Sequence, residues 1–255
     1  FRRHPKLLRY LIKYIEDTTS KGHYWFNSQW RHLADLLKRS PSLLCEKSIM
    51  KVLEQLTNSK NMDVACNTLR MIPRMIELNV NVNENCKLIS LLVKALRRTD
   101  EGVKLEVCWV LRDMGKQAAK NDVISELVTA LLESSEDVKE FACQALGEMG
   151  EEAAKDDVIS ALVTALLESS DEVKKSACEA LGKMGENAAQ KNVISALATT
   201  LTNRNLSDRL RWSVCRAMEY MCEKAAGNNV ISALVTELLK GSKSDKRHVC
   251  DALET

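Results

Sequence analysis

A four-residue motif returns along this chain at an almost constant interval, and this periodicity constrains the fold more than any other feature. Asp or Asn followed by Val-Ile-Ser begins at residues 122, 157, 192 and 229, so the steps are 35, 35 and 37 residues. A column of cysteines keeps the same interval: Cys108, Cys143, Cys178, Cys215 and Cys250. Such periods are typical of repeat architectures, in which each unit buries its apolar face by stacking on its neighbours.

Each repeat is predicted to contain two helices, as the copy that starts at Asp157 illustrates. Its first half has apolar residues at helical spacing, and we expect these to share one buried face: Val158, Ile159, Leu162, Val163, Leu166 and Leu167. Ser169 and Glu172 have the spacing of a capping box, which predicts the start of the second helix. The residues expected to be buried in that helix are Val173, Ala177, Cys178, Ala180, Leu181 and Met184. Gly185 is expected to end it in the left-handed conformation.

The second helix also carries a family-like pattern. The stretch from Asp171 to Gly185 reads DEVKKSACEALGKMG, and it resembles the second helix of short HEAT-like repeats. Tetratricopeptide repeats have a similar period, but their Trp-Leu-Gly and Tyr landmarks and their late Pro are missing here. The resemblance implies an all-α fold, namely a right-handed α-solenoid of stacked antiparallel helix pairs.

This resemblance divides the chain into three expected parts. Residues 86–255 are expected to form the HEAT-like array, and residues 41–85 an irregular helical repeat. Residues 1–40 are expected to be either a divergent helical cap or the tail of a preceding domain. Because the chain begins at Phe1 and Thr255 falls within an expected helix, we also expect the protein to continue in both directions.

HEAT repeats typically pair an acidic residue in the turn between their helices with a basic residue just after the following Val. Glu133 and Glu168 occupy the acidic position, and Arg98 and Asn205 interrupt it in two other repeats. The basic position is held by Lys104, Lys139, Lys174, Arg211 and Lys246. The resemblance therefore implies an incomplete ladder of acidic and basic residues along the array.

The nine cysteines and four histidines indicate neither a metal site nor a disulfide framework. There is no Cys-x-x-Cys, and five cysteines recur at one repeat position, where we expect them to pack in the core as small apolar residues. No His is followed by Glu, which excludes the His-Glu iron ligands of HEAT-like deoxyhypusine hydroxylases. We therefore expect no cofactor, no metal and no enzymatic activity. Free thiols favour a reducing, intracellular compartment, the cytoplasm.

Charge is balanced overall, with 37 Lys and Arg against 35 Asp and Glu, but it is uneven along the chain. Residues 133–172 contain twelve acidic and only two basic side chains, whereas residues 1–40 contain nine basic and three acidic ones. The acidic block would repel phosphates, which argues against nucleic-acid binding. No apolar run approaches the 18 residues of a membrane span. The blocks instead favour a partner of complementary charge, although they also fit plain solvated helix faces.

The concave face of the array is the expected binding surface, because the resemblance places the second helices there. On each second helix, the positions two, six and ten residues after its first Val or Leu should share one exposed face. These columns are Leu105, Trp109 and Asp113; Glu140, Gln144 and Glu148; Lys175, Glu179 and Lys183; and Trp212, Arg216 and Tyr220. Trp, Arg and Tyr dominate binding hot spots, so the last column is the strongest candidate. The alternative is that Trp212 fills a packing gap beside the two-residue insertion near 202–205.

We expect a non-catalytic scaffold or sensor module that binds a protein or peptide partner on this face. The predicted contact residues are Trp109, Asp113, Glu140, Glu148, Lys175, Lys183, Trp212, Arg216 and Tyr220. The near-identical units also resemble HEAT arrays attached to NACHT-type ATPases, which implies a larger multidomain protein. Two alternatives stay open. One is a bilin-lyase-like HEAT protein, and the other is a nucleic-acid reader of the DNA glycosylase type, whose concave face uses Trp and Asp, as in Trp109 and Asp113.

Overall fold

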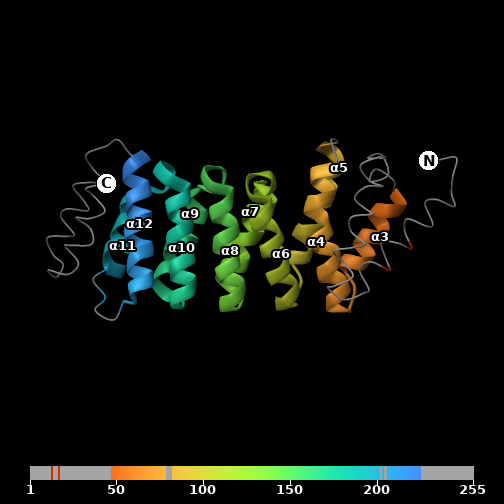
Figure 1. The fold of residues 1–255 in the computed structure, drawn as a ribbon, viewed down its shortest axis with the longest axis horizontal. Coiled ribbons are helices and arrows are strands. Elements are labelled where there is room, and N and C mark those ends of the chain that lie inside the picture. Colours follow the sequence, from red (N-terminus) through yellow and green to blue (C-terminus); the bar gives the residue numbers. More distant parts are fainter. Residues whose placement is uncertain are drawn as a thin grey trace. The chain divides into compact units, whose positions relative to one another are not determined.

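The computed structural model is helical in every regular element of the part of the chain that it describes (Figure 1). The described residues are 13, 17, 47–78, 82–201, 203 and 206–224. The α-helices are α3 (Lys47–Thr57), α4 (Met62–Leu78), α5 (Val82–Leu96), α6 (Glu101–Met114), α7 (Asn121–Glu133), α8 (Glu136–Met149), α9 (Asp156–Glu168), α10 (Asp171–Met184), α11 (Lys191–Leu201) and α12 (Asp208–Lys224). Short 3₁₀ helices follow three of them: η2 (Gly115–Ala118), η3 (Gly150–Ala153) and η4 (Gly185–Ala188). The predicted all-α fold class is confirmed.

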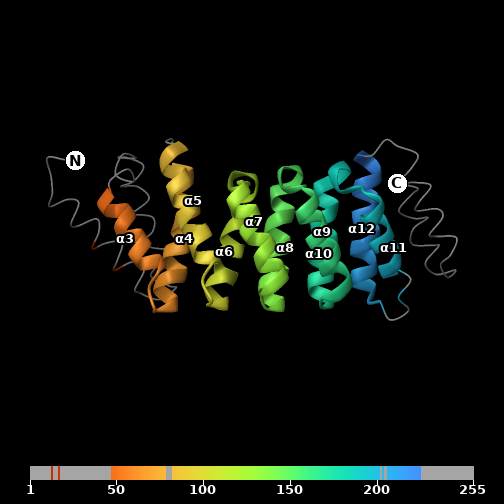
Figure 2. The same cartoon turned by 180° about the vertical axis from the view of Figure 1, so that it is seen from behind.

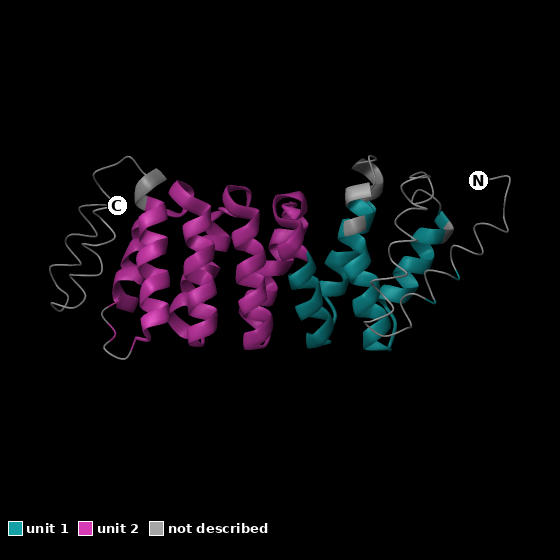
Figure 3. Cartoon of the chain, viewed as in Figure 1, with its two compact units in different colours: residues 1–110 teal, residues 111–255 magenta. Residues whose placement is uncertain are grey.

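The chain divides into two compact units, residues 1–110 and 111–255 (Figure 3). In unit 1, α3 packs on both α4 and α5, and α4 also packs on α5. Unit 2 contains the end of α6 and all helices from α7 to α12. The expected part boundaries at residues 40 and 85 stay predictions. Residues 1–40 lie outside the described residues, apart from Lys13 and Asp17.

Unit 2 is built from helix pairs that stack in order along the chain (Figures 1 and 2). The first helices of successive repeats, α7, α9 and α11, contact one another in sequence, and so do the second helices α8, α10 and α12. Within each repeat the two helices also pack together, α7 on α8, α9 on α10 and α11 on α12. This arrangement of two helical layers is the one predicted for an α-solenoid.

The apolar pattern of the first helices predicts which of their residues are buried in the core, with one exception. The predicted residues of α9 that are at most 1% exposed are Val158, Ile159, Leu162 and Leu166. Val163 is half-buried. Leu167 is 46% exposed, as is its repeat equivalent Leu132 at 52%, so its predicted burial is wrong. A helix turns by about 100° per residue, so the residue after Leu166 faces away from the buried stripe.

The second helices bury the residues predicted for them, including the cysteine column. In α10 the buried residues include Val173, Ala177, Cys178, Ala180, Leu181 and Met184. Cys108, Cys143 and Cys178 are fully buried and Cys215 nearly so, whereas Cys250 lies outside the described residues. None of these four buried cysteines is in a disulfide, and burial raises the pKa of the Cys108 thiol to about 12 and also raises the pKa of Cys178. These cysteines act as small apolar core residues, as predicted.

Two glycines determine how closely the second helices approach each other. A Cβ atom on Gly147 would lie 2.9 Å from the Cα atom of Ala180. A Cβ atom on Gly182 would lie 3.1 Å from the Cα atom of Ala217. Carbon atoms that are not bonded to each other prefer a separation of about 3.5–4.0 Å. The backbones of α8 and α10, and of α10 and α12, can therefore touch only because these positions lack a side chain.

The turns differ from the prediction in two details. Gly185 has the expected positive φ of 61°, but its ψ of −136° lies outside the left-handed helical region, and the chain continues into η4. Ser170 is the N-cap residue of α10, and its side chain makes no capping hydrogen bond, so the predicted capping box of Ser169 and Glu172 is wrong. Instead, the backbone N–H of Ser170 donates to Oε2 of Glu136 at 2.7 Å.

Glu136 connects two successive repeats at their turns. Besides the Ser170 bond, its Oε1 accepts a hydrogen bond from Nζ of Lys139 at 3.0 Å. Hydrogen bonds from the backbone amide and then the side chain of Ser170, followed by Lys139, lower the pKa of the Glu136 carboxyl to about 2. Lys139 therefore pairs with Glu136, three residues before it, and not with the turn residue Glu133 that the family pattern implies. Lys104 likewise pairs with Glu101 at 2.9 Å.

Replacing Glu136 by Gln should lower the free energy of unfolding by up to about 1 kcal/mol at neutral pH, because the lost acceptor is charged but largely exposed to solvent. The pKa of Glu136 is depressed in the folded chain. Its contribution is therefore fully present above the ordinary carboxyl pKa of 4.5 and is lost as the pH falls toward about 2. Urea unfolding of both proteins at pH 7 and pH 3 should show a smaller difference at the lower pH. An equal difference at both values would contradict this role.

Gly147→Val should lower the free energy of unfolding by about 1–3 kcal/mol, because the new side chain would press against the backbone of α10. Ser160→Val is the matched control: it also places Val within a helix, but Ser160 is exposed on α9, so its effect should stay within about 0.5 kcal/mol. Urea unfolding followed by circular dichroism measures both. Equal stability of the two variants would show that Gly147 does not limit the approach of α8 and α10.

Candidate functional site on the second helices

The face of α8, α10 and α12 carries predicted contact residues that are open to solvent. The exposed ones are Glu148, Lys183, Trp212, Arg216 and Tyr220, and the half-buried ones are Glu140 and Lys175. Gln144 and Glu179, which belong to the same strips but were not predicted as contact residues, are also half-buried. Residues four apart stack on one side of a helix, so each column forms a continuous strip along its helix. Two grooves run between these strips.

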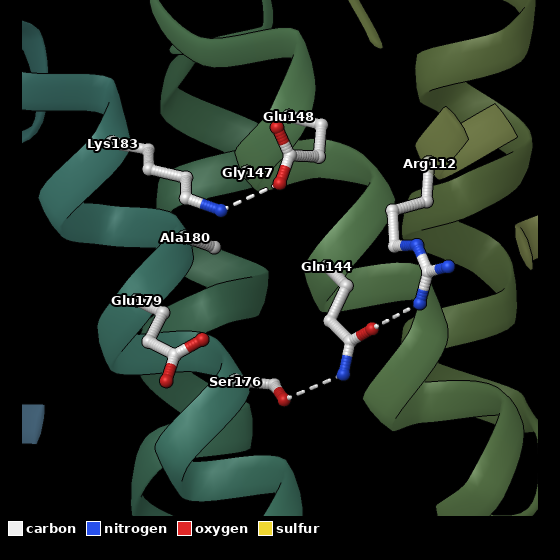
Figure 4. Close-up of a pocket in the computed structure, with 8 residues that line it drawn as sticks. All are labelled: Arg112, Gln144, Gly147, Glu148, Ser176, Glu179, Ala180 and Lys183. Atoms are coloured by element: carbon white, nitrogen blue, oxygen red, sulfur yellow. Dashed lines mark hydrogen bonds and ion pairs between the residues drawn. The ribbon is translucent and has the colours of Figure 1, made fainter. Parts of the chain in front are cut away.

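The first groove, of about 330 Å³, lies between α8 and α10 (Figure 4). Its lining residues are Arg112, Gln144, Gly147, Glu148, Ser176, Glu179, Ala180 and Lys183. The two helices touch where Gly147 meets Ala180, and polar or charged side chains surround that contact. The groove is therefore polar in character rather than apolar.

Gln144 connects three helices across the first groove (Figure 4). Its Oε1 accepts a hydrogen bond from Nη1 of Arg112 at 3.2 Å. Its Nε2 donates to Oε1 of Glu140 at 3.1 Å and to Oγ of Ser176 at 3.4 Å. The Arg112 guanidinium also lies 5.6 Å from the centroid of the Phe141 ring. Gln144 and Arg112 are thus held in place by partners within the chain.

An ion pair and an unpaired carboxylate complete the first groove. Nζ of Lys183 lies 2.7 Å from Oε1 of Glu148, and this pair spans two repeats. Both side chains are 45% exposed, so the pair adds little to stability. The carboxylate of Glu179 points into the groove, and it has no ion-pair partner within the part of the chain that the structure describes (Figure 4).

The second groove, of about 260 Å³, lies between α10 and α12. Its lining residues are Glu179, Lys183, Trp212, Ser213, Arg216, Ala217 and Tyr220. The guanidinium carbon of Arg216 lies 4.8 Å from the centroid of the Trp212 ring and 5.3 Å from that of the Tyr220 ring. Nε and Nη2 of Arg216 donate to Oη of Tyr220 at 3.1 and 2.7 Å. These contacts form one stack of three side chains, held by cation–π attraction and hydrogen bonds.

Trp212 is 57% exposed, which excludes the alternative that it fills a packing gap. Because the guanidinium covers part of its ring and is itself bonded to Tyr220, the three side chains restrict one another's rotation. The Tyr220 hydroxyl is the main reason that the pKa of Arg216 lies above its ordinary value. The stack is therefore an ordered, cationic and aromatic surface.

The other predicted contact residues do not line either groove. Trp109 is 38% exposed and belongs to the part of α6 in unit 1. Asp113 pairs with Nη2 of its neighbour Arg112 at 3.1 Å. Glu140 accepts the hydrogen bond from Gln144, and Nζ of Lys175 lies 3.9 Å from a carboxylate oxygen of Glu172.

Sequence reasoning missed Arg112 and Ser176, because it considered only one strip on each helix. A signal was present in the repeat register: Arg112 lies 42 residues after Arg70, the same step as from Cys66 to Cys108. Arg70 makes a related contact in unit 1, where its Nε and Nη2 donate to the Glu106 carboxylate at 2.6 and 2.7 Å. Glu106 lies 35 residues before Phe141, the residue whose ring Arg112 contacts, so Glu106 and Phe141 hold equivalent positions in successive repeats.

Within the described ranges, no group of three or more His, Cys, Asp or Glu side chains is placed to hold a metal ion. None of the helices described is long and apolar enough to cross a lipid bilayer.

The family model for HEAT repeats matches residues 124–219, from α7 to α12. This segment is similar to HEAT repeats. The resemblance stated from the sequence is thereby confirmed, and the residues of both grooves lie in or beside the matched segment. No curated protein matches the chain.

Solved structures share the fold of the HEAT array and its flanking helices. An engineered protein solved by a structural genomics consortium has a TM-score of 0.60 and 21% identity, over 82% of this chain and 96% of that one. A designed armadillo repeat protein in complex with the peptide (KR)4 has a TM-score of 0.57 and 21% identity, over 79% and 97%. Importin beta has a TM-score of 0.66 and 15% identity, over 96% of this chain and 34% of importin beta. The chain therefore has an all-α helical-repeat solenoid fold, similar to that of these structures.

Glu140→Gln should raise the free energy of unfolding slightly at neutral pH. Burial, and then the nearby Glu172 carboxylate, raise the pKa of Glu140 above its ordinary value of 4.5, so ionised Glu140 opposes folding. The gain should be present above the raised pKa and should vanish as the pH falls below about 4.5. Urea unfolding at pH 7 and pH 4 measures both. The control Glu133→Gln, at an exposed site, should change little. A lower stability of Glu140→Gln at pH 7 would contradict this reasoning.

Proposed function

We propose that the face of α8, α10 and α12 binds an extended segment of a protein partner, and that the chain is a non-catalytic scaffold or sensor module. The observation that carries this proposal is the stack of Trp212, Arg216 and Tyr220 on the second groove. Trp, Arg and Tyr are the residue types that contribute most to protein interfaces. Because this stack is already ordered in the free chain, little side-chain entropy would be lost on binding.

The grooves support binding of an extended segment rather than of a compact ligand. Glu179 and Lys183 line both grooves, so the two form one track across three second helices. Repeat arrays commonly use such surfaces for recognition. A designed armadillo repeat protein of similar fold is described in complex with a (KR)4 peptide, which supports a peptide as the class of ligand.

In this proposal the central contacts are made by Glu148, Lys183, Trp212, Arg216 and Tyr220. Asp113, Glu140 and Lys175 are proposed to contribute at the margins of the track, and Trp109 separately from unit 1. We also propose an intracellular, cytoplasmic setting, which the buried cysteines support, since those described are not in disulfides and such thiols persist where disulfides do not form. For the whole molecule, we propose that this chain is part of a larger multidomain protein that resembles the NACHT-type ATPases.

The test is a selection of random 12-residue peptides displayed on phage, with the 255-residue chain as bait. Affinities of the enriched peptides are then measured by fluorescence anisotropy. Trp212→Ala/Arg216→Ala should weaken binding at least about tenfold, since each of these residue types commonly contributes more than 1 kcal/mol at an interface.

The matched control is Leu132→Ala/Leu167→Ala, which removes two exposed side chains from the first helices. This control should leave peptide affinity unchanged, and circular dichroism should verify that both double variants are folded. If no peptide is enriched, or if both double variants bind as the parent does, the proposed binding face is wrong.

A further inference from the structure

Two ionised side chains of opposite sign face the second groove without an ion-pair partner among the residues that the structure describes. They are Glu179 on α10 and Arg216 on α12. The other charged residue of this groove, Lys183, is already paired with Glu148. Glu179 and Arg216 do not pair with each other either, although Glu179 is close enough to help raise the pKa of Arg216. The groove therefore presents one free negative and one free positive charge.

Arg216 is prepared to bind an anionic group. A guanidinium has five N–H donors, and the Nε donor and one Nη2 donor of Arg216 are used by Tyr220. Both N–H donors of Nη1 and the second N–H donor of Nη2 remain available to a ligand, at the outer edge of the guanidinium. This edge matches the two oxygens of a carboxylate, which arginine binds through two parallel hydrogen bonds. Trp212 and Tyr220 fix the plane of the guanidinium, and so they fix the direction in which it can bind.

Glu179 provides the opposite charge at the junction of the two grooves. It is half-buried and lines both of them, and its neighbours Gln144 and Ser176 are hydrogen-bonded to each other. A carboxylate has about four acceptor positions, so it can receive an ammonium or guanidinium group from a ligand. The exposed ring of Trp212 offers an apolar surface to the methylene groups of such a side chain.

We propose that the second groove selects a partner segment that presents an acidic and a basic side chain close together, the acidic one bound by Arg216 and the basic one by Glu179. This inference rests on the proposed function, since it defines the chemistry of the segment that the face binds. Charge complementarity supports it: uniformly basic segments would meet Arg216 and Lys183, and uniformly acidic ones would meet Glu179 and Glu148. Only a segment of mixed charge satisfies both free groups.

The experiment uses the same phage selection, now with the parent chain and two charge-reversed variants as baits. Peptides enriched by the parent should contain an acidic and a basic residue at a constant spacing. In peptides selected by the Arg216→Glu variant, the position that was acidic should become basic. In peptides selected by the Glu179→Lys variant, the position that was basic should become acidic. In a parent-selected peptide, changing the acidic residue to its amide or the basic residue to Gln should each weaken binding to the parent chain at least about tenfold.

The peptide-side changes keep the inference testable if a charge-reversed variant does not fold, because they use only the parent chain. Suppose enriched peptides lose affinity for Trp212→Ala/Arg216→Ala, but neither charge on the peptide matters. The inference would then be wrong, while the proposed function would stand. If enriched peptides carry one charge sign only, the inference is also overturned. If no peptide is enriched, both proposals fail.

Discussion

The close contact of the second helices is the interaction on which the rest of this array depends. Gly147 meets Ala180 and Gly182 meets Ala217, so closely that a side chain on either glycine would press against the backbone of the next helix. The buried cysteines Cys143 and Cys178 add further small residues to the same helices. Because the backbones touch, only short side chains lie at the contact, and longer ones surround it. The grooves lie where small residues meet between two second helices and longer side chains stand on either side.

Repetition of the core leaves the exposed face free to vary. Val, Ala, Cys and Leu recur at the buried positions of α8 and α10, whereas the exposed strips differ completely. The central position of the strip, for example, is Gln144 in α8, Glu179 in α10 and Arg216 in α12. Packing requires the recurring residues, so the candidate recognition chemistry can only reside in the others. The strip on α12, with Trp212, Arg216 and Tyr220, differs most from the strips of the other second helices.

The acidic residues of the central block have separate tasks, which charge counting could not distinguish. Glu136 accepts a hydrogen bond from a backbone amide of the next repeat, and Glu148 pairs with Lys183 across repeats. Glu140 is half-buried beside Glu172 and carries a raised pKa. Glu179, just beyond this block, has no ion-pair partner within the described residues. Carboxylates that are close in sequence therefore have different roles: Glu136 and Glu148 link successive repeats, whereas Glu179 faces a groove without an ion-pair partner in the described part of the chain.

The sequence by itself determined the helical repeat, its two layers, the buried cysteine column and the strips of exposed and half-buried residues on the second helices. It could do so because burial follows the helical period and the 35-residue interval, both of which are local and repeated. Only the tertiary structure decided that Glu136 bonds to Ser170, that Gln144 links Arg112 to Ser176, and that Glu179 and Arg216 face one groove unpaired. These partnerships depend on the offset between neighbouring helices, which no local sequence pattern encodes.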